Sequence, residues 1–186
     1  MLSTYAIEAV AAIKKSGKFL WLLLGIAIAA LAWIFRAGLE FMESRWAGQE
    51  EYSHGYMIPL VALFLLWRAA PELRRMNWTA SWLSPLVMLV ALIGWALGEL
   101  SSLFIISNYS LWLALCALAL AVLGWAGMTR IWAALVYLVF TIPLPNFLYN
   151  NLSAKLQLLS TDIGVAVIRL FDVSVFVEGN VIDLGS

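Results

Sequence analysis

The sequence predicts an all-α polytopic membrane protein, and three observations support that fold class. Hydrophobic residues make up 64% of the 186 residues, against roughly 45–50% in soluble domains. Charged residues account for only 12% and the mean hydropathy is +0.93, so too little charge is available to solvate a globule of this size. The apolar residues form long runs between short polar stretches, as transmembrane helices require.

The same composition excludes several functional classes. The formal net charge is zero and the basic residues occur in small groups, unlike the basic stripe of a nucleic-acid-binding protein. Cys116 is the only cysteine, which excludes an internal disulfide and a cysteine-based zinc site. The sequence has no phosphate-binding glycine loop, HExxH or GxSxG motif. We therefore expect no cofactor, no metal and no nucleic-acid partner.

About five transmembrane helices are expected within a single membrane domain, because a bilayer core requires about 20 mostly apolar helical residues. The suitable runs lie at about 19–35, 52–70, 82–98, 109–127 and 131–147. The first run follows Lys14, Lys15 and Lys18, and no small-x-small cleavage site comes after it. A retained signal-anchor helix therefore fits better than a cleaved signal peptide.

Helix packing and the membrane boundaries also leave marks on the sequence. Gly94 and Gly98 form a small-xxx-small pair that could let another helix approach closely, although such pairs are also common by chance in membrane helices. Tryptophans near the span ends are expected to form an aromatic belt and not a binding cage. They include Trp21, Trp33, Trp46, Trp67, Trp82 and Trp132.

The distribution of charge predicts the orientation of the chain. With a cytoplasmic N-terminus, seven Lys and Arg residues lie inside and four outside, as the positive-inside rule requires. The inside residues are Lys14, Lys15, Lys18, Arg68, Arg74, Arg75 and Arg130, and the outside residues are Arg36, Arg45, Lys155 and Arg169. The first outside loop would contain Glu40, Glu43, Glu50 and Glu51. His54, the only histidine, is then expected at the extracytoplasmic boundary.

The pattern changes after the fifth predicted span. Pro143 and Pro145 in "TIPLPN" remove backbone donors and would break the last turns of that helix. The stretch 152–171 is amphipathic, and we expect a helix in the outer membrane interface. A sixth transmembrane span is the alternative for this stretch.

A short extracytoplasmic β-hairpin is expected over residues 173–184. "VSVFVEGNVIDL" contains two short β-branched runs around Glu178, Gly179 and Asn180. Glycine and asparagine supply the positive φ that a tight hairpin turn needs. A hairpin leaves open strand edges, so it should lie in water outside the bilayer.

His54 has two interpretations on spacing alone. In a helix, Glu50 and Glu51 lie four and three residues before it on the same face, where a carboxylate would favour the charged imidazole. That arrangement could orient a general base or hold an anionic substrate group. Alternatively, His54 lies at headgroup level, Ser53 caps the helix and Pro59 kinks it.

Three other residues have side chains that could take part in chemistry or binding. Cys116 lies in the apolar run "LWLALCALALAVLG" with no basic residue nearby, so a structural thiol is expected. Asp162 and Arg169 lie seven residues apart, too far for a tight direct bridge. They could line a polar cleft, or be two solvated charges on the interfacial helix.

Three segments, in order, resemble the exosortase family. "EYSHGYMIPLVALFLLW" (51–67) resembles the D/E-Y-S-H-G-x-x-x-P-L element at the second span of exosortases. "IPLPNFLYNNLSAKLQLLST" (142–161) resembles their P-x-P element and the helix that follows it. "FVEGNVIDL" (176–184) resembles the hairpin that precedes their active site.

The resemblance implies a multi-pass protein of the bacterial inner membrane with its site facing the periplasm. The activity would be that of a membrane cysteine peptidase or transpeptidase, often alongside exopolysaccharide production. Its partners would be membrane lipids and the C-terminal sorting signal of exported (PEP-CTERM) proteins. That signal comprises a Pro-Glu-Pro motif, a transmembrane helix and a basic tail.

The sequence departs from the family pattern at the nucleophile. The proposed catalytic motif, A-C-S/N-G-x-R, should follow the hairpin and does not occur in these 186 residues, and Cys116 has different neighbours and depth. We therefore expect the N-terminal portion of an exosortase, inactive alone and without a catalytic residue. The framework or substrate-proximal residues implied by the resemblance are Tyr52, Ser53, His54, Gly55, Pro59, Pro143, Pro145, Gln157, Glu178, Gly179 and Asn180.

The sequence leaves two alternative functions open. The chain could be a small membrane protein that binds a partner or substrate helix without catalysis. It could also be a small transporter with His54 in a proton path, although the predicted spans contain almost no carboxylates.

Overall fold

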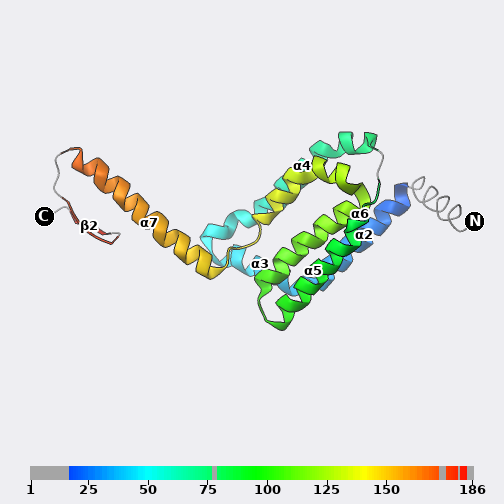
Figure 1. Cartoon of the computed structure of the whole chain (residues 1–186), viewed down its shortest axis with the longest axis horizontal. Coiled ribbons are helices and arrows are strands. Elements are labelled where there is room, and N and C mark those ends of the chain that lie inside the picture. Colours follow the sequence, from blue (N-terminus) through cyan, green and yellow to red (C-terminus); the bar gives the residue numbers. More distant parts are fainter. Residues whose placement is uncertain (1–16, 77–78, 172–174, 180, 184–186) are drawn as a thin grey trace, which may run out of the picture. The chain divides into compact units, whose positions relative to one another are not determined.

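A computed structural model describes residues 17–76, 79–171, 175–179 and 181–183 (Figure 1). The elements, in order, are α2 (Gly17–Ile34), α3 (Arg36–Gly48), the 3-10 helix η1 (Glu50–Tyr56), α4 (Met57–Arg75), α5 (Leu83–Leu100), α6 (Phe104–Val139), α7 (Asn146–Arg169), β1 (Phe176–Glu178) and β2 (Val181–Asp183). The chain divides into two compact units, Met1–Pro143 and Leu144–Ser186.

The first predicted span corresponds to α2, but the segment after it is not a loop. The chain bends by 73° between α2 and α3, around Phe35, whose side chain is fully buried. The expected outside loop is therefore helical over Arg36–Gly48. Hydropathy alone missed α3, because this helix is too polar to read as a membrane span.

The second predicted span is η1 followed by α4, and its boundaries differ from the expected 52–70. The α-helix begins at Met57 and continues to Arg75. Pro59 lies in its first turn, where the missing backbone donor costs nothing. Pro59 therefore has no reason to kink α4. A second proline, Pro71, lies inside the helix.

Helix α6 contains the fourth and fifth predicted spans, because it folds back on itself at Gly124. The indole N–H of Trp112 donates to the carbonyl of Leu135 at 2.7 Å, 23 residues further along. In a straight helix these residues would be about 34 Å apart. Gly124 has φ 66° and ψ −171°, a conformation almost restricted to glycine. The predicted reversal after residue 127 therefore comes slightly earlier.

The prediction that prolines end the last helix of this unit is confirmed. Helix α6 ends at Val139, before the expected end at residue 147, and Pro143 follows a short non-helical stretch. Residues that precede a proline disfavour the helical conformation, which explains why the helix ends early.

The core of the first unit consists of small and apolar residues at the helix crossings. One buried cluster joins α2, α5 and α6 through Leu31, Phe35, Ala91 and Ala114. Helices α5 and α6 approach closely (Figure 1). A side chain at Gly98 would contact the backbone of Ser107, and one at Gly94 would contact the Ser110 hydroxyl. Of the two interpretations of this glycine pair, the structure therefore shows close helix packing and not a chance occurrence.

The outer surface of the helices is apolar, as a lipid environment requires. Three helices of the described part of the chain are long and apolar enough to cross a membrane: Glu50–Arg75, Leu83–Leu100 and Phe104–Val139. The bent pair of α2 and α3 would make a fourth. The helical, multi-pass class is confirmed, whereas these criteria do not reach the predicted count of five.

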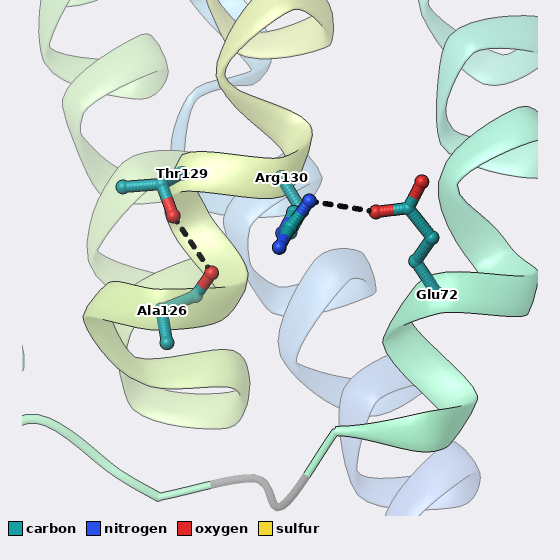
Figure 2. A network of polar contacts seen from close by, with 4 residues as sticks. All are labelled: Glu72, Ala126, Thr129 and Arg130. Atoms are coloured by element: carbon teal, nitrogen blue, oxygen red, sulfur yellow. Dashed lines mark hydrogen bonds and ion pairs between the residues drawn. The ribbon is translucent and has the colours of Figure 1, made fainter.

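A single ion pair joins α4 to the second half of α6 in the described part of the chain. An Nη atom of Arg130 donates to a carboxylate oxygen of Glu72 at 3.0 Å (Figure 2). Both side chains are more than half exposed. Such a pair is worth about 0–1 kcal/mol in water, so it contributes little to the stability of the fold.

The second unit consists of α7 and two short strands. Helix α7 begins at Asn146, earlier than the expected residue 152, because Pro145 is its N-cap residue. It is not among the helices that meet the length and hydropathy criteria for a span. Strands β1 and β2 pair antiparallel, with Phe176 opposite Asp183. Part of the predicted hairpin, including Asn180, lies outside the described residues.

Candidate functional site

The 3-10 helix η1 is held against α3 by Trp46. The indole ring of Trp46 lies 5.3 Å from the ring of Tyr56 in an edge-on arrangement. Gly55 is buried, and a Cβ atom there would collide with the same indole. Glycine at this position therefore lets the "EYSHGY" segment pack on α3.

Trp46 also joins this segment to the residues before Pro143. Its indole N–H donates to the backbone carbonyl of Thr141 at 2.9 Å, across 95 residues of sequence. Thr141, Ile142 and Pro143 are all buried. The "EYSHGY" segment and Thr141 therefore both contact Trp46 within the first unit. Trp46 is an internal anchor, so its assignment to the aromatic belt was wrong.

A carboxylate of α3 faces the same turn. The hydroxyl of Tyr56 donates to Oε1 of Glu43 at 3.2 Å. The guanidinium of Arg45 lies 5.1 Å from the ring centre of Phe41. We define the rim of this region as Glu43, Trp46 and Tyr52–Tyr56. The rim combines aromatic faces with carboxylate, hydroxyl and imidazole groups.

His54 lies in the 3-10 helix, and this corrects the expected relationship to its acidic neighbours. Side chains three residues apart are aligned in a 3-10 helix, so Glu51 shares a face with His54 and Glu50 does not. Ser53 donates to the carbonyl of Glu50 at 2.7 Å. It therefore stabilises the turn internally and does not cap α4, whose N-cap residue is Tyr56.

The imidazole itself is accessible. His54 is an exposed residue, and its ring centre lies 6.5 Å from that of Tyr52. Tyr52 is half-buried, so the tyrosine ring forms part of the support on which the histidine lies. This arrangement can present an N–H donor or a ring nitrogen acceptor to a partner at the rim.

A buried polar cluster near the bend between α2 and α3 was not predicted. Ser107 and Asn108 are almost completely buried, and both polar atoms of the Asn108 amide lack a hydrogen-bond partner. Gly38 lies against this amide, and Glu99 accepts a 3.4 Å hydrogen bond from the Ser107 hydroxyl. The run "SNYS" at a helix start is the sequence signal that could have indicated this cluster.

The candidate residues of the second unit lie on α7 and in the strands. Gln157 borders an open hollow of about 440 Å³, formed with Ser153, Leu156, Ser160 and Thr161. Gly179 has φ +63°, which confirms the prediction that glycine supplies the positive φ of this turn. Glu178 is the last residue of β1.

Neither a nucleophile nor a metal site accompanies these residues in the described part of the chain. Cys116 is buried against Ile131 and Leu135. No group of three or more His, Cys, Asp or Glu side chains is placed to hold a metal ion, among the residues that the structure describes. The rim has no thiol.

Comparison with known protein families identifies the family of this chain. The model of the transmembrane exosortase family (Exosortase_EpsH) matches residues 46–186. The chain belongs to the exosortase family. The matched part of this exosortase begins at Trp46, the residue that joins η1 to the segment before Pro143. No curated protein and no solved structure matches the chain.

Proposed function

We propose that this exosortase chain docks the C-terminal sorting signal of exported proteins at the periplasmic membrane surface. The contact of Trp46 with both Gly55 and Thr141 carries the proposal. It supports the family segment that contains η1 against the residues just before Pro143 and fixes the rim at one end of the helices. A rim fixed in this way can receive a short peptide that emerges from the membrane.

The chemistry of the rim suits the Pro-Glu-Pro motif of such a signal. An exposed imidazole can donate a hydrogen bond to the glutamate carboxylate. The rings of Tyr52 and Tyr56 offer flat apolar faces to the prolines. His54 and Tyr52 are therefore the proposed binding residues, and Trp46 positions them.

The 186 residues are proposed to bind this signal without cutting it. Attack on a peptide bond by a thiol requires a thiolate and donors for the developing oxyanion. Cys116 is buried among apolar side chains and lies in a membrane-spanning segment. The peptidase or transpeptidase activity of the family therefore needs a nucleophile other than Cys116.

The proposed topology has five spans with a cytoplasmic N-terminus in the inner membrane. Helix α2 makes the first crossing, η1 with α4 the second and α5 the third. The fold-back at Gly124 gives α6 two antiparallel segments, which make the fourth and fifth. This count puts the rim on the periplasmic side, with α7 at the outer interface and the strands in water.

A peptide-binding experiment tests the proposal. The purified chain in lipid nanodiscs is titrated with a labelled peptide that carries Pro-Glu-Pro, a transmembrane helix and a basic tail. The matched control peptide has Ala-Ala-Ala in place of Pro-Glu-Pro. We expect binding of the first peptide at least about tenfold tighter, equivalent to about 1.4 kcal/mol, and no cleavage.

Equal affinity for the two peptides would refute the docking proposal. Cleavage of the first peptide by the Cys116→Ala variant would refute the claim that the chain does not cut. Because binding and cleavage are read separately, each part of the proposal can fail alone.

A further inference from the structure

A half-open apolar cavity lies between α2, α4 and α6 and shares no residue with the rim. Its volume is about 370 Å³. Aliphatic side chains form most of the wall, including Leu20, Leu24, Leu66, Ala70, Leu118 and Leu135. Among the residues that the structure describes, Arg74, near the end of α4, is the one charged residue that borders it.

The cavity exists because α2 packs closely only near its C-terminal end. Leu31 and Phe35 contact Ala91 and Ala114 there. Near its N-terminal end, by contrast, Leu20 borders an open space. In a membrane such a space between helices is filled by something apolar.

The charges near the mouth of the cavity favour an anionic group. Glu72, on the same helical turn as Arg74, is already paired with Arg130 of α6 (Figure 2). Arg75 adds a second exposed positive charge. Of the described residues, no carboxylate forms an ion pair with Arg74. The cavity therefore combines an apolar interior with a basic mouth.

We propose that this cavity binds one acyl chain of an anionic phospholipid, whose phosphate is held by Arg74. Lipids of this kind bind at basic sites between transmembrane helices on the cytoplasmic side. The guanidinium can make bidentate hydrogen bonds to a phosphate. The unbranched acyl chain replaces the contacts that α2 does not make with α4 and α6.

The charge at the mouth of the cavity argues against a sorting signal as its occupant. Such a signal ends in a basic tail, which Arg74 would repel. An acyl chain carries no charge and requires no polar partner along its length.

Native mass spectrometry of the purified 186-residue chain tests the proposal. Dioleoylphosphatidylglycerol and dioleoylphosphatidylcholine, which share the same chains, are titrated separately. We expect the anionic lipid to bind more tightly, and Arg74→Gln to weaken it about fivefold. The matched control Arg75→Gln removes the neighbouring charge, which does not border the cavity, and should have a smaller effect.

A second pair of variants separates occupation of the cavity from attraction to the surface. Ala70→Phe fills the cavity and should weaken the anionic lipid more than about tenfold, because several methylene groups lose their contacts. Ala126→Phe adds the same ring at an exposed position of α6 and should have little effect. If Ala70→Phe is not monodisperse, Leu20→Trp fills the cavity from α2.

Four results would overturn the proposal. They are equal binding of the two lipids, equal losses from Arg74→Gln and Arg75→Gln, unchanged binding in both filling variants, and displacement of the lipid by free inorganic phosphate. None of them depends on docking of a sorting signal, so the two proposals fail independently.

Discussion

The indole N–H of Trp46 donates a 2.9 Å hydrogen bond to the backbone carbonyl of Thr141, 95 residues away in the sequence. This bond satisfies a carbonyl in the non-helical stretch between α6 and Pro143. An unpaired carbonyl in a buried stretch of this kind would be costly. Trp46 therefore holds the last residues of the first unit and also packs against η1.

Trp46→Phe should lower the free energy of unfolding by about 1 kcal/mol. Phenylalanine retains a ring against Gly55 and Tyr56 but cannot donate to Thr141, so one hydrogen bond is lost. Thermal unfolding in detergent measures the change. The control is Trp82→Phe, at a tryptophan that is 79% exposed. Equal effects of the two substitutions would contradict the role of the Trp46 bond.

Gly55→Ala should destabilise the first unit by about 1–3 kcal/mol, because a methyl group there collides with the Trp46 indole. The control is Gly25→Ala in α2, where a Cβ atom meets nothing within 4 Å. Alanine favours a helix over glycine, so the control should be neutral or stabilising. If Gly55→Ala were equally well tolerated, η1 would not pack on α3 as described.

Gly124→Ala and Gly179→Ala separate backbone strain from crowding. Both glycines have positive φ, but a Cβ atom at Gly124 would also collide with the carbonyl oxygen of Thr79, whereas Gly179 has open space. Left-handed strain costs about 1–2 kcal/mol, so Gly179→Ala should lower the free energy of unfolding by only that amount. Gly124→Ala should lower it further, so that the variant no longer elutes as a monodisperse protein. Similar behaviour in size-exclusion chromatography would argue against the close approach at Gly124.

Single-cysteine labelling tests the proposed orientation. In a Cys116→Ala background, Ser53→Cys should react with a membrane-impermeant maleimide added to intact spheroplasts. Thr129→Cys, near the reversal of α6, should react only after the membrane is opened. Both positions are exposed in the protein, so the membrane alone should separate them. The reverse pattern would place the rim in the cytoplasm.

The sequence was sufficient to predict the helical membrane class, because hydropathy is a local property summed over about 20 residues. Helices α2 and α5 lie close to their predicted ranges for this reason. Turn chemistry was also readable at Gly179, since positive φ is a property of the residue itself. The glycine pair of α5 showed only that close approach was possible, because such pairs also occur by chance and the partner helix is not indicated by the sequence.

The contacts that define the rim could not be predicted in the same way. Nothing near Trp46 in the sequence indicates that its partner is Thr141, because that contact depends on how the intervening helices pack. Helix α3 was missed because a polar helix beside a membrane has no strong hydropathy signal. The Asn108 cluster was missed for a related reason: the run "SNYS" marks a polar helix start but does not show that Gly38 lies against Asn108.

His54→Ala is the substitution that tests the proposed binding residues. We expect it to weaken the Pro-Glu-Pro peptide about tenfold or more, because a hydrogen bond to a charged group contributes about 1.5–3 kcal/mol. Titration of the same peptide in nanodiscs measures the change. His54→Gln retains a donor and should recover part of the affinity.

The matched control is Gln49→Ala, just before η1, which removes a polar side chain outside the rim. Binding of the Ala-Ala-Ala peptide should be the same for all variants, because it lacks the carboxylate that His54 would hold. An unchanged Pro-Glu-Pro affinity in His54→Ala would leave His54 as an interfacial residue of the membrane boundary. A loss that His54→Gln does not relieve would indicate instead that the ring supports Tyr52 by packing.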